Sequence, residues 1–525
     1  MIIDKGPFVW YNCNNKHLEV PMSLFKVNES PFLRHNTQVY KNVFIDMPVE
    51  DAELPVYEDI KHKLPVPVWE GHDDAVSCYY KAWQLAFGNL RRPVPGTGFV
   101  SNFIDTAFNG FLFMWDSSFI VMFGKYASHI FNFQRTLDNM YSHQHSDGFI
   151  CREICEKENG EMWDHFNPSG TGPNVMPWSE WEYYLQTGDK ERIANVFDPL
   201  CAYHYWLMLY RSWPDGSYWT TGLGCGMDNI PRADSKYDPH THHGFMSWID
   251  ACAQQYLSGT ILIEMAKVLG REDEVEWLED ERKLLANTVN NTMWSDTDSF
   301  YYDKNRDGTL GTAKTVGAYW TLLAGLVPED RRDSFVAHLD CESEFKRPNR
   351  VPALSADDPA YNSDTGGYWC GGVWAPATYM VLKGLDKYGY DKLAFEIASD
   401  YLRNVVEVYN TDGTLYENYS PEAAKKGAAR PDFVGWTGLA PISVMFEYVF
   451  GIRSDAQAKK ITWHVNLKEK HGIRGLRLGD AVVDLICEAR ENESDAPVIT
   501  VNSTLPITVE IIYGDKRETI SVKGE

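Results

Sequence analysis

The chain has 525 residues and carries 74 acidic side chains against 49 Lys and Arg, which gives a formal net charge of −25. This surplus of negative charge disfavours phosphate backbones and anionic lipid surfaces, so we expect neither nucleic acid nor a membrane as a partner. With 44% hydrophobic and 23% charged residues, the composition is that of an ordinary globular protein and excludes the disordered and disulfide-stapled classes.

The sequence also bears on where in the cell the protein is expected. No apolar run approaches the ~18 residues that a membrane span needs. The residues after Met1 lack the basic and apolar stretches of a secretory signal. The ten cysteines are dispersed, and Cys151 and Cys155 fit neither a redox pair nor a zinc pair. We therefore expect a cytoplasmic protein.

The hydrophobic pattern divides the chain into three regions. Residues 1–72 are rich in Pro and Asn without helical periodicity, which predicts a short N-terminal cap of strands and loops. From 73 to 452 the pattern is that of amphipathic helices, for example over 119–140 and 256–269. Residues 457–525 show alternating patterns, which predict a small antiparallel β domain.

The central region predicts a closed ring of helices. Several of its helical segments end in glycine, the residue that most easily takes the left-handed conformation that closes a helix. These endings are Thr187-Gly188, Leu269-Gly270, Tyr388-Gly389 and Phe450-Gly451. Their spacing and the length of the region fit helical hairpins closed into an (α/α)6 barrel, so the predicted fold class is mainly α.

Four loops between helical segments place aromatic residues beside carboxylates, and loops on a rigid scaffold are where function concentrates. They contain Phe113-Met114-Trp115-Asp116, Gly226-Met227-Asp228-Asn229-Ile230-Pro231-Arg232, Tyr368-Trp369 with Trp374, and Tyr416-Glu417 with Trp436. Singly, each has a simpler interpretation. Asp116 could cap a helix, Asp228 could form an Asx turn before a proline, and the aromatic residues, 14% of the chain, could fill a core.

Taken together, these motifs resemble the trehalase-like inverting glycosidases, most closely glycoside hydrolase family 63 with its mannosylglycerate and glucosylglycerate hydrolase relatives. The likeness spans about residues 100–452 and keeps the family's order of motifs. It implies that Asp228 is the general acid and Glu417 the general base, without a metal or cofactor. The same motifs supply the candidate substrate-binding residues: Phe113, Trp115, Asp116, Asn229, Arg232, Tyr368, Trp369, Trp374 and Trp436.

The chain also departs from the family's pattern. Gly224-Cys225 replaces the common Glu-Ser, Cys370-Gly371-Gly372 replaces Arg-Gly-Pro, and Gly172-Pro173-Asn174 replaces Gln-Pro-Pro. These changes leave both carboxylates in place but remove polar contacts. They bear on the identity of the substrate more than on the type of reaction.

The expected reaction is hydrolysis of a small α-glucoside or α-mannoside by an exo-acting, inverting α-glycosidase. An inverting enzyme needs one protonated and one ionised carboxyl, ~6.5–9.5 Å apart to leave room for water. Asp228 would need a raised pKa from an aromatic, low-dielectric pocket. Glu422, which follows Pro421, is expected to face solvent.

Other functions stay open at this point. A sugar epimerase on the same barrel could use paired histidines such as His145 and His242, and a non-catalytic carbohydrate-binding protein would need no acid or base. The loop from Asp303 begins like a calcium-binding EF-hand, but its twelfth position is Lys314 instead of Glu, so a tight turn is favoured. The histidines of 240–243 lack the spacing of a complete metal site.

Overall fold

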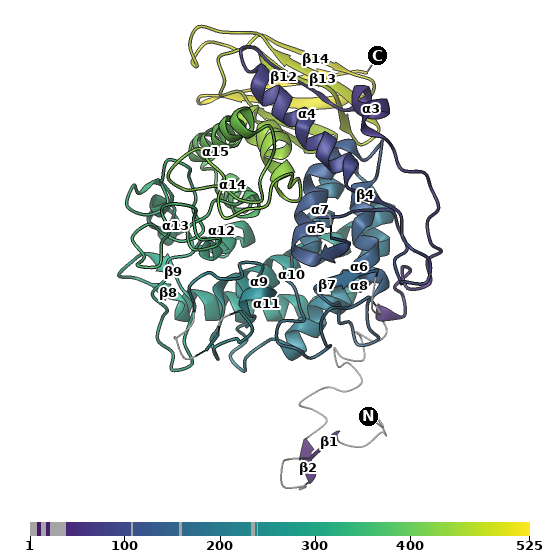
Figure 1. Ribbon diagram of the computed structural model, residues 1–525, viewed down its shortest axis with the longest axis vertical. Helices are drawn as coiled ribbons and strands as arrows, with labels where there is room; N and C mark the ends of the chain where they lie inside the picture. The colour runs from purple at the N-terminus through teal and green to yellow at the C-terminus, as the bar shows by residue number, and fades with distance from the viewer. Residues whose placement is uncertain are drawn as a thin grey trace.

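The computed structural model describes residues 8–11, 17–20, 38–106, 109–156, 160–232, 237–238 and 240–524. The chain is mainly helical, with a sheet region at its C-terminal end. Figure 1 shows the helices arranged in a ring, with the sheets packed along one side of it. None of the helices in the described part combines the length and apolar character that a bilayer crossing requires.

The helices follow one another round the ring. The longer ones are α4 (Asp73–Gly88), α5 (Met114–Gly124), α7 (Met176–Thr187), α8 (Lys190–Tyr210), α10 (Ile249–Leu269), α11 (Glu276–Thr292), α13 (Glu329–Ala337), α14 (Ala375–Lys387), α15 (Asp391–Asp412) and the π-helix η9 (Ala440–Val449). The short helix α3 (Tyr57–Ile60) precedes them, and the short helices α6 (Asp138–Ser142), α9 (Gly222–Cys225) and α12 (Trp320–Ala324) lie between them. Contacts link α5 to α7, α7 to α10, α10 to α12, α12 to α14 and α14 to α15, and the last helix, η9, contacts both α4 and α5.

The glycine endings are confirmed where they terminate α7 and α10. Gly188 and Gly270 adopt φ of 68° and 67°, the left-handed conformation expected after a helix. The predicted helix over 256–269 is the C-terminal part of α10.

The continuous helix predicted over 119–140 is wrong. Helix α5 ends at Gly124, 3-10 turns follow, and α6 begins at Asp138. At Gly124 a Cβ would lie 2.7 Å from Cγ of Phe133, so the chain folds back here at very close range. Most of this segment is buried, so its apolar residues fill the core and their spacing does not require a continuous helix.

Two four-stranded sheets form the C-terminal region. One has the order β10 (Ile452–Asp455), β11 (Lys460–His464), β15 (Ile507–Tyr513), β16 (Lys516–Val522). The other has the order β14 (Ile499–Ser503), β13 (Ala481–Cys487), β12 (His471–Leu478), β3 (Val66–Trp69). Strand β3 comes from the predicted N-terminal cap. Of the first 37 residues of that cap, the structure describes only β1 (Phe8–Tyr11) and β2 (His17–Val20), which pair with each other.

The sequence predicted a wholly antiparallel β domain, and this prediction is wrong for one pair of strands. Strands β11 and β15 run parallel, with Ile461 opposite Val509. Between them the chain crosses to the other sheet to form β12, β13 and β14 and then returns. A parallel pair requires such a crossover, whereas the other pairings of these strands are antiparallel.

Candidate active site

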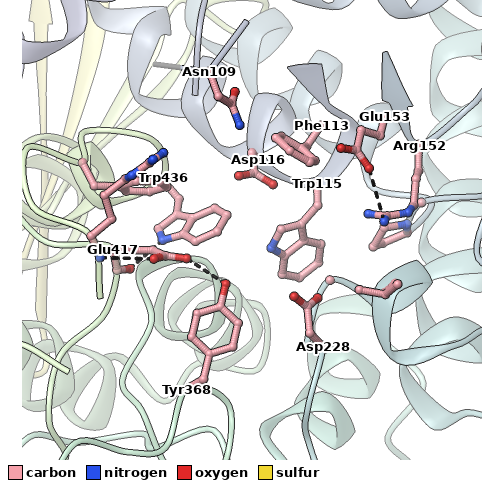
Figure 2. A pocket seen from close by; sticks show the side chains of 16 residues that line it. Asn109, Phe113, Trp115, Asp116, Arg152, Glu153, Asp228, Tyr368, Glu417 and Trp436 are labelled. Atoms are coloured by element: carbon pink, nitrogen blue, oxygen red, sulfur yellow. Dashed lines mark hydrogen bonds and ion pairs between the residues drawn. The ribbon is translucent and has the colours of Figure 1, made fainter. Parts of the chain in front are cut away.

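A cavity of about 420 Å³ lies where loops from distant parts of the chain meet. The predicted residues that line it are Phe113, Trp115, Asp116, Asp228, Tyr368, Glu417 and Trp436. Figure 2 shows the carboxyl groups of Asp116, Asp228 and Glu417 around this space. The fold therefore brings both predicted catalytic carboxyls to one cavity.

Asp116 enters the cavity from the first turn of α5. The short strand β6 (Phe111–Phe113) pairs with β7 (Glu153–Cys155) and leads directly into that helix. Asp116 is not the N-cap, because Phe113 occupies that position. Burial raises the pKa of Asp116 well above its usual range, and repulsion from Glu417 and Asp228 raises it further.

Asp228 is positioned by a tight turn after α9. Gly226 ends this helix with φ of 76°, and a Cβ there would lie 2.6 Å from Cδ2 of Trp115. Only glycine allows the loop to pass this close to the indole. Burial raises the pKa of Asp228, while the charges of Arg152 and His240 oppose the increase.

Glu417 accepts two hydrogen bonds that favour its ionised form. The hydroxyl of Tyr368 donates to Oε1 at 2.8 Å, and the backbone N–H of Arg430 donates to Oε2 at 3.4 Å. The indole of Trp436 donates to the backbone carbonyl of Glu417 at 2.8 Å and so holds the loop. Burial nevertheless raises the pKa of Glu417, and Asp228 adds to the increase.

Tyr368 reaches Glu417 from an unusual backbone conformation. Its φ is 70°, which lies in the left-handed region that residues other than glycine rarely adopt. Gly372 makes the conformation possible, since a Cβ there would clash with the carbonyl oxygen of Tyr368. Such conformations cost free energy and persist where the surrounding structure holds them.

Four predicted substrate-binding residues do not line the cavity but support the loops that do. Trp369 and Trp374 stack on each other with ring centres 3.9 Å apart, and Trp374 donates to the carbonyl of Tyr368 at 3.2 Å. Asn229 accepts from the N–H of Trp369 and donates to the carbonyl of Gly367, both at 2.9 Å.

Arg232 is the fourth, and its surroundings differ from the prediction. Its guanidinium is buried, forms ion pairs with Asp250 and Asp303 and lies 4.6 Å from the ring of Trp248. A buried cation needs such partners, which explains why it turns away from the cavity. Asp303 also accepts from the backbone N–H of Ile249, so the loop that resembled a calcium site is held by an arginine and the backbone.

Among the cavity-wall residues that sequence reasoning missed, four are polar or charged: Asn109, Arg152, Glu153 and Arg430. Arg152 lies 3.4 Å from Glu153 and stacks over Trp163, whose indole donates to Glu153 at 2.8 Å. For Arg152 and Glu153, the available signal was an adjacent Arg-Glu pair between the apolar residues Cys151 and Ile154.

Side chains considered for other chemistry lie elsewhere. His145 pairs with Glu161 at 2.7 Å, His242 accepts from the N–H of Gly244 at 2.9 Å, and neither histidine lines the cavity. Glu422, which was predicted to face solvent, is partly exposed and is bound to Arg347 and Tyr361. In the described ranges no group of three or more His, Cys, Asp or Glu side chains is placed to hold a metal ion.

Comparison with known proteins points to one family. The mannosylglycerate hydrolase MGH1-like glycoside hydrolase domain matches residues 111–437, which include all three carboxyls. An uncharacterised protein of Borreliella burgdorferi is 26% identical over 387 residues, covering 71% of this chain and 78% of the relative. The probable mannosyl-oligosaccharide glucosidase of Schizosaccharomyces pombe is 26% identical over 292 residues, which cover 52% of this chain but only 34% of that protein.

Solved structures agree at the level of fold. The family 63 mannosylglycerate hydrolase of Thermus thermophilus, solved in complex with glucose, superimposes with a TM-score of 0.57 at 20% sequence identity. The match covers 70% of this chain and 99% of that protein.

Proposed function

Because the chain belongs to the mannosylglycerate hydrolase MGH1-like glycoside hydrolase family and is a glycoside hydrolase, we propose that it is an exo-acting, inverting α-glycosidase. The observation that carries the proposal is the meeting of Asp228 and Glu417, far apart in the chain, at one cavity lined by aromatic side chains. The proposed substrate is a small α-glucoside or α-mannoside.

We assign the general acid to Asp228 and the general base to Glu417. Burial of Asp228 favours its protonated form, which can donate to the glycosidic oxygen as the bond to the anomeric carbon breaks. The hydrogen bonds from Tyr368 and the N–H of Arg430 favour ionised Glu417, which can take a proton from the attacking water. The products are the free aglycone alcohol and a sugar of opposite anomeric configuration.

The cavity supports attack on a terminal sugar. Its volume of about 420 Å³ is at the small end of ligand sites, and Trp115, Trp436 and Phe113 offer aromatic faces to a sugar ring. We propose that the closed circuit of helices is an (α/α)6 barrel and that the enzyme acts in the cytoplasm. On a longer oligosaccharide, an exo-acting enzyme releases monosaccharide from the first time points, whereas mid-sized early fragments would contradict this mode.

Stereochemistry gives the sharpest test of the mechanism. A single displacement on an α-glycoside must release the β-sugar first. Proton NMR of the anomeric region, recorded before mutarotation during hydrolysis of α-linked disaccharides and glyceryl glycosides, measures this directly. Early α-anomer would indicate a double displacement and overturn the role of Glu417 as base.

Two alternatives remain distinguishable by experiment. A sugar epimerase would incorporate deuterium at carbon when incubated with free sugars in heavy water, and a hydrolase would not. A carbohydrate-binding protein would bind α-glycosides without releasing sugar. Neither His145 nor His242 is among the residues that line the cavity, whereas a pair of carboxyls is, and this favours hydrolysis.

A further inference from the structure

A second, smaller cavity lies beside the catalytic one and contains an arginine without a charged partner. Arg211 follows helix α8, is 4% exposed and packs between two indoles. Its guanidinium carbon lies 4.8 Å from the ring centre of Trp206 and 4.6 Å from that of Trp219. These contacts bury the cation without neutralising it.

The hydrogen-bond partners of Arg211 are all neutral. It donates to the carbonyls of Asn167 at 2.8 Å and Tyr210 at 3.1 Å, and to the hydroxyl of Thr171 at 3.4 Å. Within the described ranges no Asp or Glu forms an ion pair with it, in contrast to Arg232, which has two such partners. A guanidinium has five N–H groups, so donors remain for a further ligand.

The pKa directions in this region fit a buried cation without a counter-charge. Burial lowers the pKa of Arg211 to about 10. The pKa of His243 is lowered to about 4 by burial and by the charges of His242 and Arg211, so this histidine stays neutral at pH 7. Buried ions are costly unless they are paired, and the described side chains here supply no counter-charge.

The small cavity, called here the Arg211 cavity, also contains polar atoms without partners. Its volume is about 30 Å³, and its wall includes Arg211, Gln254 and Asn174. Nε2 of Gln254 and Oδ1 of Asn174 have no hydrogen-bond partner in the described structure, although the two residues are only 2% and 5% exposed. This volume accommodates a guest the size of a water molecule or a single atomic ion.

We propose that the Arg211 cavity binds a small monovalent anion, such as chloride, between the guanidinium and the amide of Gln254. An anion accepts a hydrogen bond from Nε2 of Gln254 and balances the buried charge, which a neutral water molecule cannot do. Oδ1 of Asn174 is itself an acceptor and takes no part in binding the anion. A carboxylate or phosphate ester is too large for the volume. Because Gly172 and Pro173 belong to the walls of both cavities, the anion would lie next to the catalytic site without contributing to it chemically.

The test uses the whole protein without substrate, so its result is independent of the proposed hydrolysis. Thermal unfolding is compared in sodium chloride, sodium bromide and sodium gluconate at equal ionic strength. We expect the Tm to be higher by about 2 °C or more in chloride and bromide, since a ligand that binds only the folded state stabilises it. Crystals soaked in bromide should give an anomalous peak within hydrogen-bond distance of Arg211.

Three variants sharpen the test. Arg211→Gln should abolish the difference between chloride and gluconate. Gln254→Glu supplies a permanent negative charge beside Arg211 and should raise the Tm in gluconate while removing the response to chloride. Arg331→Gln is the matched control, because Arg331 also stacks on an indole, at 4.8 Å from Trp294, and donates to a backbone carbonyl; it should keep the response.

The proposal is wrong if the wild-type protein has the same Tm in chloride and gluconate, or if Arg211→Gln retains the response. Bromide density only at other positions would also overturn it. If Arg211→Gln fails to fold, Gln254→Glu and the bromide soak of the wild-type crystal still decide.

Discussion

Three carboxyl groups share one electrostatic environment, and this sets the chemistry that the residues can perform. Asp228 raises the pKa of Glu417, and both raise the pKa of Asp116, in each case together with burial. Such mutual repulsion favours at least one protonated and one ionised carboxyl, as acid and base catalysis requires.

Removal of either proton-transfer group should abolish most activity. We expect Asp228→Asn and Glu417→Gln each to lower kcat by at least ~10²-fold with the fold unchanged, since each replaces an acid or base by a neutral amide of similar shape. Steady-state kinetics on the substrate found by the glycoside screen, with circular dichroism for folding, measures this.

Glu422→Gln is the matched control. Glu422 lies five positions beyond Glu417 but binds Arg347 and Tyr361 outside the cavity lining. It should retain turnover near that of the wild type. Near wild-type activity of Asp228→Asn or Glu417→Gln would contradict the corresponding assignment.

Tyr368 should control the acidic limb of the pH profile. Its hydroxyl donates to Glu417 and lowers the pKa of that carboxyl against the increase caused by burial. The base is active when ionised, so activity falls as the pH drops through its pKa. In Tyr368→Phe this pKa rises, and the acidic limb of kcat/KM should move to higher pH. An unchanged limb alongside a reduced rate would mean that Tyr368 contacts the sugar and does not influence the base.

At the scale of elements, the turn after α9 determines where Asp228 lies. Gly226→Ala introduces a Cβ at a left-handed position and 2.6 Å from the indole of Trp115. We expect kcat/KM to fall by at least ~10-fold because Asp228 and Trp115 are displaced together. Kinetics and urea unfolding of the same sample separate a loss of activity from a loss of stability.

Gly270→Ala is the control for backbone strain alone. Gly270 has φ of 67° at the end of α10, and a Cβ there would meet no atom within 4 Å. It should destabilise the protein by about 1 kcal/mol and leave kcat/KM unchanged. Equal losses of activity in the two variants would refute a specific role for the turn.

At the scale of the molecule, four buried charges join helices from opposite parts of the chain. Lys125 and Lys383 each contact both Glu182 and Glu447, at 2.8 to 3.0 Å. These residues lie just after α5, in α14, in α7 and in η9, respectively. Despite burial, the two lysines hold the pKa of Glu447 far below its usual range.

Disruption of this group should destabilise the whole ring of helices. Glu447→Gln leaves two buried cations with one carboxylate, and we expect a loss of about 3–5 kcal/mol in the free energy of unfolding. Urea denaturation measures the loss. Arg403→Gln, which removes an exposed ion pair with Asp400, should cost less than about 1 kcal/mol; similar losses in both variants would show that the buried group has no special role.

Features that depend on local chemistry were predictable from the pattern of amino acids. Helical and alternating periods identified the helical region and the C-terminal strands, because the period of burial is a property of each element. Glycines marked helix ends because the left-handed conformation is a local requirement. The order of the motifs singled out Asp228, Glu417, Trp115 and Tyr368, which the structure brings to one cavity.

Which distant groups satisfy one another depends on the three-dimensional fold and could not be predicted locally. Arg232 could have met a sugar, yet two buried carboxylates from other segments balance its charge. Strand β3 joins β12, and β11 runs parallel to β15, because sheet partners are chosen by long-range packing that no local pattern records. Arg152 lines the cavity for the same reason: its position depends on where distant loops fold, whereas the periodicity of its own segment reports only burial.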